Sequence, residues 1–268
     1  MTDPTVVTAS WSDAIGYEAY IGRWSRQVAR QFVADLDVPA GRRWLDVGCG
    51  TGALTRTVLD LAEPAGVQAV DRSPTFLRHA AAHVPDPRVT FRTADAAALP
   101  VDDGSVDVVV SGLVLHFLAD PGAAVTAWRR AAVPGGTVAA YVWDYAEGMQ
   151  MMRAFWLAAA RVDPAVATLD EAARFPICAP GPLRAVFTGA GLTDVVTGAI
   201  EVPTVFADLD DLWTPFLGGT GHAPVYVATL TDDVRAAIKE ELRRSLPVQD
   251  DGSIALTARA WTVRGQVP

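Results

Sequence analysis

The sequence has little of several features that define other protein classes. Its two cysteines, Cys49 and Cys178, lie far apart and lack the spacing of a disulfide framework or a metal site. It has a single lysine, Lys239, and a net charge of −9, which argues against a basic face for DNA or RNA. We therefore expect a cytoplasmic protein with no bound metal and no nucleic-acid partner.

Long hydrophobic runs are also missing. The longest candidate, around residues 131–143, is broken by Pro134, Gly135 and Gly136, and the first ten residues carry neither a basic nor an apolar segment. We therefore expect no signal peptide and no membrane partner. No repeat or low-complexity linker divides the 268 residues, half of which are hydrophobic, so residues 1–268 are expected to form one domain with a large core.

The sequence does contain a regular alternation of strand-like and helix-like segments from about residue 42 to 143. Apolar runs predict strands at 42–47, 67–71, 88–95, 105–111 and 135–143. Between them, helical spacing follows the glycines at 48–52 and the cap-and-proline pairs Ser73-Pro74 and Asp120-Pro121. This alternation predicts an α/β fold with a doubly wound parallel sheet.

The stretch LDVGCGTGAL, residues 45–54, ends the first expected strand on a glycine loop. Gly48, Gly50 and Ala53 also satisfy the dinucleotide pattern G-x-G-x-x-G/A, so the loop alone fits both NAD and S-adenosylmethionine (SAM). Asp46 favours SAM, because a carboxylate at the mouth of the loop repels a pyrophosphate and attracts an ammonium or a sulfonium. The alternative is that Asp46 only caps the loop.

Two more carboxylates follow the next two expected strands. Asp71 ends the second strand, where a carboxylate can accept the ribose hydroxyls of either cofactor. Asp95 ends the third strand, where it can accept the amino group of adenine while the Ala96 amide faces a ring nitrogen. Carboxyl ends of neighbouring parallel strands lie at one edge of a sheet, so these acids predict a single adenosine site.

Residues 42–143 resemble the class I SAM-dependent methyltransferases, in particular the small-molecule group that includes the ubiquinone/menaquinone C-methyltransferases. WLDVGCGTGALT, AVDRSPTFLRHA, TADAAALPVDDGSVDVVVSGLVLHFLADP and RRAAVPGGTVAAYVW match successive motifs of that family. The resemblance implies a Rossmann-like, mostly parallel seven-stranded sheet whose last strand is antiparallel. It also implies SAM contacts at Asp46, Gly48, Cys49, Gly50, Asp71, Arg72, Asp95, Ala96 and Ser111. The segment SGLVLHF after the fourth strand differs from the NPPY-type motif of methyltransferases that act on nucleic acids, which argues against DNA or RNA bases as the substrate.

Two residues outside the loop are candidates for further roles at the site. Tyr17, Tyr20 and Trp24 share one face of an expected N-terminal helix, which similar enzymes lay over the cofactor as a lid. Arg23 on that helix can pair with the methionine carboxylate of SAM, although it can equally be a solvated arginine. His116, after the fourth strand, is a candidate general base or a structural histidine.

The substrate is expected to bind in the irregular segments 144–180 and 204–230, which we interpret as a helical cap. Their aromatic residues favour a small apolar or aromatic acceptor, although most of them can simply form the core of the cap. Methyl transfer from SAM to that acceptor is the expected reaction. The alternatives are an NAD-dependent oxidoreductase and a SAM-binding sensor or cyclisation catalyst that does not methylate.

Overall fold

The computed structural model describes residue 16, residues 18–218 and residues 221–268. The chain divides into two compact units. The first contains the described residues up to Trp24, Asp144–Pro176 and Glu201–Arg259, and the second contains Ser25–Trp143, Ile177–Ile200 and Ala260–Pro268.

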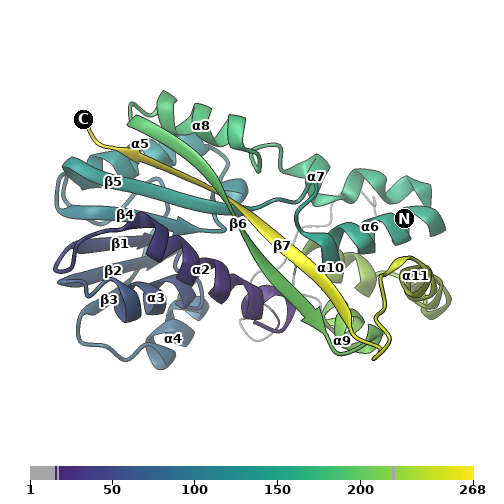
Figure 1. Cartoon of the computed structure of the whole chain (residues 1–268). Helices are drawn as coiled ribbons and strands as arrows, with labels where there is room; N and C mark the ends of the chain where they lie inside the picture. Colours follow the sequence, from purple (N-terminus) through teal and green to yellow (C-terminus); the bar gives the residue numbers. More distant parts are fainter. Residues whose placement is uncertain (1–15, 17, 219–220) are drawn as a thin grey trace. The chain divides into compact units, whose positions relative to one another are not determined.

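The second unit is built on the sheet, whose strand order is β3-β2-β1-β4-β5-β7-β6. Its strands are β1 Arg43–Val47, β2 Gly66–Asp71, β3 Val89–Thr93, β4 Val106–Gly112, β5 Ala132–Trp143, β6 Thr193–Phe206 and β7 Ile254–Gln266. The first five strands pair in parallel, and β7 runs antiparallel to β5. Figure 1 shows β3, β2, β1, β4 and β5 side by side. The predicted α/β class, the number of strands and the antiparallel last strand are confirmed.

The central strands are buried because they carry apolar residues at nearly every position, as strands covered on both faces do. Val108, Val109 and Val110 of β4 are at most 2% exposed. The helices of this unit are α2 Arg23–Leu36, which starts in the first unit, α3 Ala53–Leu61, α4 Pro74–His83, η2 Leu115–Phe117, α5 Pro121–Ala131 and α8 Pro180–Gly189. Side chains of Ser73 and Asp120 cap α4 and α5 as the cap-and-proline pairs predict.

The first unit is helical apart from the ends of β6 and β7. Its helices are η1 Glu18–Gly22, α6 Gln150–Val162, η3 Pro164–Leu169, α7 Glu171–Arg174, α9 Leu209–Trp213, η4 Thr214–Leu217, α10 His222–Ala228 and α11 Asp232–Ser245. Phe155 of α6 stacks on Phe216 with ring centroids 4.5 Å apart, and Trp156 lies 5.5 Å from Tyr226. These aromatic residues are buried against one another, so they form the core of this unit.

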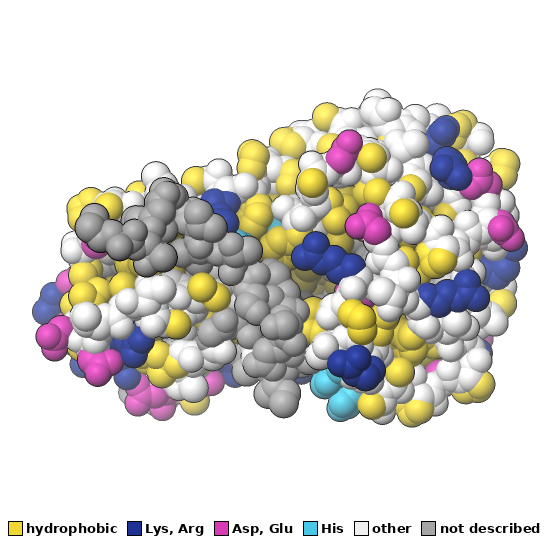
Figure 2. Space-filling view, turned by 180° about the vertical axis from the view of Figure 1, so that it is seen from behind, with side chains coloured by type: hydrophobic (Ala, Val, Ile, Leu, Met, Phe, Trp, Pro, Cys, Tyr) yellow, Lys and Arg dark blue, Asp and Glu magenta, His cyan; other side chains and the backbone are white. Residues whose placement is uncertain are grey.

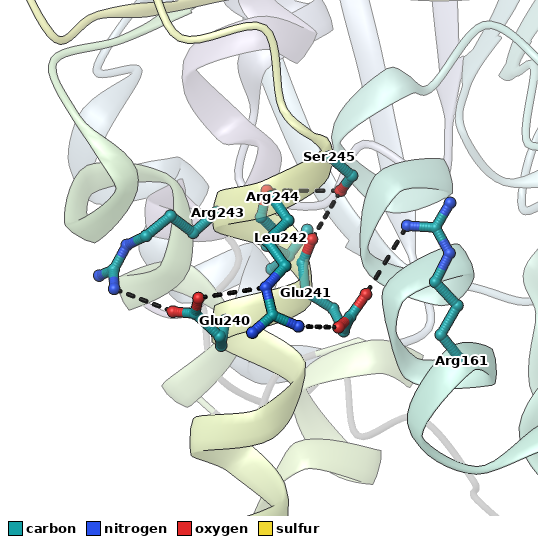
Figure 3. A network of polar contacts seen from close by, with 7 residues as sticks. All are labelled: Arg161, Glu240, Glu241, Leu242, Arg243, Arg244 and Ser245. Atoms are coloured by element: carbon teal, nitrogen blue, oxygen red, sulfur yellow. Dashed lines mark hydrogen bonds and ion pairs between the residues drawn. The ribbon is translucent and has the colours of Figure 1, made fainter.

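Charged residues of α11 form a network on its exposed side (Figure 3). Arg244 bonds to Glu240 and Glu241, and Arg161 of α6 lies 3.8 Å from Glu241. Leu242 of the same helix is completely buried. The helix therefore shows both an apolar face and a salt-bridged face.

The N-terminal segment differs from the regular helix that the aromatic spacing predicts. Residues Glu18–Gly22 form a π-helical turn before α2 begins at Arg23. Tyr20 packs edge-on against Phe216, and Trp24 packs edge-on against Phe206. Tyr17, the first residue of the expected stripe, lies outside the described residues, as do residues 219–220 of the glycine-rich segment.

None of the helices in the described part of the chain has both the length and the apolar character needed to span a membrane. Across the same residues, no group of three or more His, Cys, Asp and Glu side chains is arranged to hold a metal ion. On the face shown in Figure 2, arginine and acidic side chains are interspersed among hydrophobic ones.

Candidate functional site

The glycine loop between β1 and α3 contains three glycines with positive φ, at +74° for Gly48, +54° for Gly50 and +90° for Gly52. Their missing side chains serve different purposes. A Cβ on Gly48 would lie 2.3 Å from Val114, and one on Gly52 would lie 3.1 Å from Val84. A Cβ on Gly50 would meet only the Gly48 carbonyl oxygen, at 4.0 Å. Of the three glycines, Gly50 alone faces open space, where a ligand can approach the backbone.

The spacing predicts Asp46 at the open mouth of the glycine loop, but the structure buries its side chain. The residue is fully buried, and its Oδ2 accepts a hydrogen bond of 2.6 Å from Thr55 of α3. Its Oδ1 has no hydrogen-bond partner among the described residues. Burial, with a smaller contribution from the nearby Asp71, raises the pKa of Asp46 to about 7, while hydrogen bonds with Thr55 oppose the shift. A cationic ligand at this edge would favour the ionised form.

Asp71, the last residue of β2, is held by the backbone on both sides. Its Oδ2 accepts from the Gly50 amide at 2.9 Å, and its Oδ1 accepts from the Ser73 amide at 2.8 Å. These bonds fix the carboxylate beside the one open glycine of the loop. Since each oxygen can accept more than one bond, ribose hydroxyls still fit here. The adjacent Arg72 is exposed.

Asp95 follows β3 in a tight turn, in which its Oδ1 accepts from the Ala97 amide at 2.8 Å. The carbonyl of Ala96 accepts from the indole of Trp128 at 2.9 Å. Trp128 is completely buried, so it anchors the turn that carries both residues. The sheet order places β1, β2 and β3 next to one another, so Asp46, Asp71 and Asp95 come from three adjacent strand ends.

Cys49 and Ser111 have structural contacts inside the second unit. The Cys49 thiol is buried with Ala69 and Leu77, and burial, together with Asp46 and Asp71, raises its pKa well above the usual value. The Ser111 hydroxyl donates to the Val47 carbonyl at 2.7 Å and thereby joins β4 to β1. Both residues can offer backbone groups to a cofactor, but these side-chain groups are already buried.

His116 lies on the short 3₁₀ helix η2 after β4 and is 7% exposed. Its ring lies 3.9 Å from that of Phe117. Two residues of the connecting turn are notable: Leu113 has a φ of +62°, which is strained for a bulky side chain, and Val114 packs on Gly48. The turn before His116 therefore packs on the glycine loop, and the role of His116 as a base stays a prediction.

Arg23 belongs to the first unit, where its Nη1 lies 3.3 Å from Asp211. The guanidinium lies over the rings of Trp24 and Phe206. The pairing of Arg23 with the SAM carboxylate stays a prediction. Sequence reasoning did not identify Asp211 as its partner, because 188 residues separate the two.

A second buried carboxyl, Glu171, was also not anticipated. It is 2% exposed, accepts a hydrogen bond from Trp156, and has a pKa raised to about 7, mainly by burial. A glutamate at the start of a short helix carries no sequence signal of burial, so only the packing of α6 against this segment reveals it.

Comparisons with known proteins agree with this geometry. A family described as a methyltransferase domain matches residues 45–140. A trans-aconitate 2-methyltransferase of Methylobacterium radiotolerans is 32% identical over 184 residues, which are 64% of this chain and 68% of the relative. A malonyl-[acyl-carrier protein] O-methyltransferase of Hahella chejuensis is 31% identical over 134 residues, 50% of this chain and 48% of the relative.

Several curated relatives are matched over less than half of their own length, between 27% and 48%. Among solved structures, a phosphoethanolamine N-methyltransferase of Haemonchus contortus in complex with S-adenosylhomocysteine has a TM-score of 0.60 at 16% identity. That comparison covers 97% of this chain and 58% of the other, and it shows the shared fold. The matched glycine loop, the sheet order and the similarity to the trans-aconitate 2-methyltransferase show that the chain belongs to the class I SAM-dependent methyltransferase family.

Proposed function

We propose that the protein transfers the methyl group of SAM to a small organic acceptor that is apolar or aromatic. The observation that carries the proposal is Asp71, whose carboxylate is held beside the open face of Gly50 by the amides of Gly50 and Ser73. A carboxylate in that position fits a ribose, and no phosphate is needed beside it. Family membership identifies SAM as the nucleoside that carries this ribose.

The residues proposed to hold SAM come from the adjacent strand ends of the second unit. The polar contacts are assigned to Asp46 for the positive end, Asp71 for the ribose and Asp95 with Ala96 for adenine. Gly48, Cys49 and Gly50 form the backbone wall, and Arg72 and Ser111 flank it. When bound, SAM would supply an electrophilic methyl group; an acceptor atom would attack the methyl carbon in line as the carbon–sulfur bond breaks and S-adenosylhomocysteine leaves.

The acceptor is proposed to be small and largely apolar because aromatic side chains dominate the first unit, which includes most of the predicted cap (144–180 and 204–230). His116 is proposed to take the proton when the acceptor is a hydroxyl. Metals, membranes and nucleic acids have no part in this proposal.

Calorimetry with S-adenosylhomocysteine (SAH) and with NADH tests the cofactor, and we expect saturable binding of SAH alone. Incubation with methyl-labelled SAM and a panel of phenols, carboxylic acids and amines tests the reaction by label transfer and by release of SAH. Binding of NADH without SAH would identify an oxidoreductase. SAH binding without label transfer to any of the panel would favour a protein that uses SAM without methylating.

A further inference from the structure

Five donor atoms of the first unit are buried without a hydrogen-bond partner among the described residues. They are the Tyr20 hydroxyl, Nε and Nη2 of Arg23, the Trp24 indole nitrogen and the Thr204 hydroxyl. Tyr20, Trp24 and Thr204 are 2%, 7% and 2% exposed. A buried polar group without a hydrogen-bond partner destabilises the folded state, so donors that the described residues leave unpaired favour binding of an acceptor of hydrogen bonds.

The guanidinium of Arg23 is oriented for one kind of partner. Its Nη1 is engaged by Asp211 at 3.3 Å, which leaves the edge formed by Nε and Nη2. The ring centroids of Trp24 and Phe206 lie 4.3 and 4.9 Å from its central carbon and fix its plane. Two adjacent N–H groups of an arginine bind the two oxygens of a carboxylate as a pair.

Two of the other donor residues, Trp24 and Thr204, are tied to Phe206 of β6, and the third, Tyr20, packs edge-on against Phe216. The ring centroids of Trp24 and Phe206 lie 5.5 Å apart. Thr204 stands two residues before Phe206 in β6, so the side chains of Thr204 and Phe206 point to the same face of the strand. Tyr20 lies in the π-helical turn Glu18–Gly22, three residues before Arg23, the first residue of α2. Indole and guanidinium groups only donate hydrogen bonds, and the two hydroxyls can donate as well. The cluster therefore matches an anionic acceptor of hydrogen bonds.

We propose that this donor cluster, formed by Tyr20, Arg23, Trp24 and Thr204, binds a carboxylate of the methyl acceptor. The inference rests on the proposed function and narrows its acceptor to apolar or aromatic carboxylic acids. All four residues belong to the first unit, whereas the glycine loop, Asp71 and Asp95 belong to the second. We assign the carboxylate to the acceptor, and the titrations at saturating SAH distinguish it from the carboxylate at the amino-acid end of the cofactor.

The test measures binding of acetate, benzoate and phenylacetate to the full chain by calorimetry. The three corresponding amides serve as uncharged controls of the same shape. Each titration is repeated at saturating SAH. We expect at least one acid to bind saturably, its amide to bind at least tenfold more weakly, and SAH to leave the affinity for the acid unchanged or to improve it.

Variants locate the binding. Arg23→Gln should weaken binding of the acid about 10- to 100-fold, the loss expected for a charge-assisted pair. Arg30→Gln, at an exposed position of α2, serves as the charge-matched control and should bind normally. Tyr20→Phe and Thr204→Val should each weaken binding several-fold without lowering the unfolding midpoint, because the described residues offer their hydroxyls no hydrogen-bond partner. A purely structural role would change the midpoint and leave the preference for acid over amide intact.

The proposal is overturned if none of the acids binds saturably, if acids and amides bind alike, or if Arg23→Gln binds as the wild type does. If SAH competes with the acid and Arg23→Gln weakens SAH binding, the carboxylate belongs to the cofactor instead. Failure of the proposed function is a separate result, since it appears as absence of SAH binding or of methyl transfer.

Discussion

At the scale of single residues, we predict that substitutions at Gly48 and Gly50 have different effects on the free energy of unfolding and on SAH affinity. Gly48→Ala places a methyl group 2.3 Å from Val114, so it should lower the free energy of unfolding strongly, and Val114→Ala should partly restore it. Gly50→Ala meets open space, so its cost should be the left-handed strain of about 1–2 kcal/mol. SAH affinity should nevertheless fall in Gly50→Ala, because the methyl group occupies the open face.

Urea unfolding and SAH calorimetry on both variants check this contrast. A Gly50→Ala protein that binds SAH as tightly as the wild type would remove the open face of Gly50 from the cofactor site.

Asp46 gives the stability a defined pH dependence. Its pKa is about 7 in the folded chain against an ordinary value of 3.8, so the folded state binds more protons between these values. The stability contributed by this group is therefore present in full below about pH 4 and is lost as the pH rises to about 7, by about 1.4 kcal/mol for each unit of pKa difference. Asp46→Asn keeps an acceptor for Thr55 and should lack this slope.

The difference in unfolding free energy between the wild type and Asp46→Asn, measured in urea from pH 4 to pH 8, isolates this group. Parallel pH profiles for the two proteins would show that Asp46 does not titrate with a raised pKa.

His116 is predicted to affect the reaction and not the cofactor. As a general base it contributes roughly 10²–10⁴-fold in rate, so His116→Ala should lower turnover by that factor and leave the SAH dissociation constant nearly unchanged. His83→Ala, at an exposed position of α4, is the matched control. Turnover within a few-fold of the wild type would make His116 a packing residue next to Phe117.

At the scale of elements, α11 should depend on its apolar stripe and little on the charges of Figure 3. Leu242 is completely buried, so Leu242→Ala should cost about 2–5 kcal/mol. Glu241 contacts Arg244 and Arg161, but the arginines are more than half exposed, so Glu241→Ala should cost less than about 1 kcal/mol. Urea unfolding of the two variants compares these contributions. Equal losses would mean that the network stabilises the helix more than exposed ion pairs do.

At the scale of the whole molecule, SAH should stabilise the fold by mass action. At a free concentration 100 times its dissociation constant, a ligand that binds only the folded state adds about 2.7 kcal/mol. We expect hydrogen exchange to slow most at residues 46–54 and 71–73, which contain the loop and the amides that Asp71 accepts. In Asp71→Ala the same SAH concentration should stabilise less, and exchange of the Gly50 amide should be faster even without ligand. Slowing confined to other segments would contradict the assigned cofactor site.

The local pattern of the sequence determined most of the sheet. Strand boundaries from 42 to 143 agree with the structure to within three residues, because buried parallel strands are continuous apolar runs and their helices begin at recognisable caps. The family, the position of Asp71 at the end of β2 and the turn that carries His116 also follow from neighbouring residues. The positions of Asp71 and of this turn depend on residues only a few positions away in the chain.

Only the tertiary structure decided features that join distant segments. Position 48 must be glycine because Val114 fills the space of a side chain. Asp46 is buried with a hydrogen bond from Thr55, and Leu113 takes a strained φ between β4 and η2. The π-helical turn at Glu18–Gly22 packs on η4 through Tyr20 and Phe216, and the donor cluster includes Thr204 of β6, about 180 residues after Trp24. Periodicity reports which side of an element is apolar. It carries no information on which distant side chain will pack there, or on which buried donors will remain without a partner.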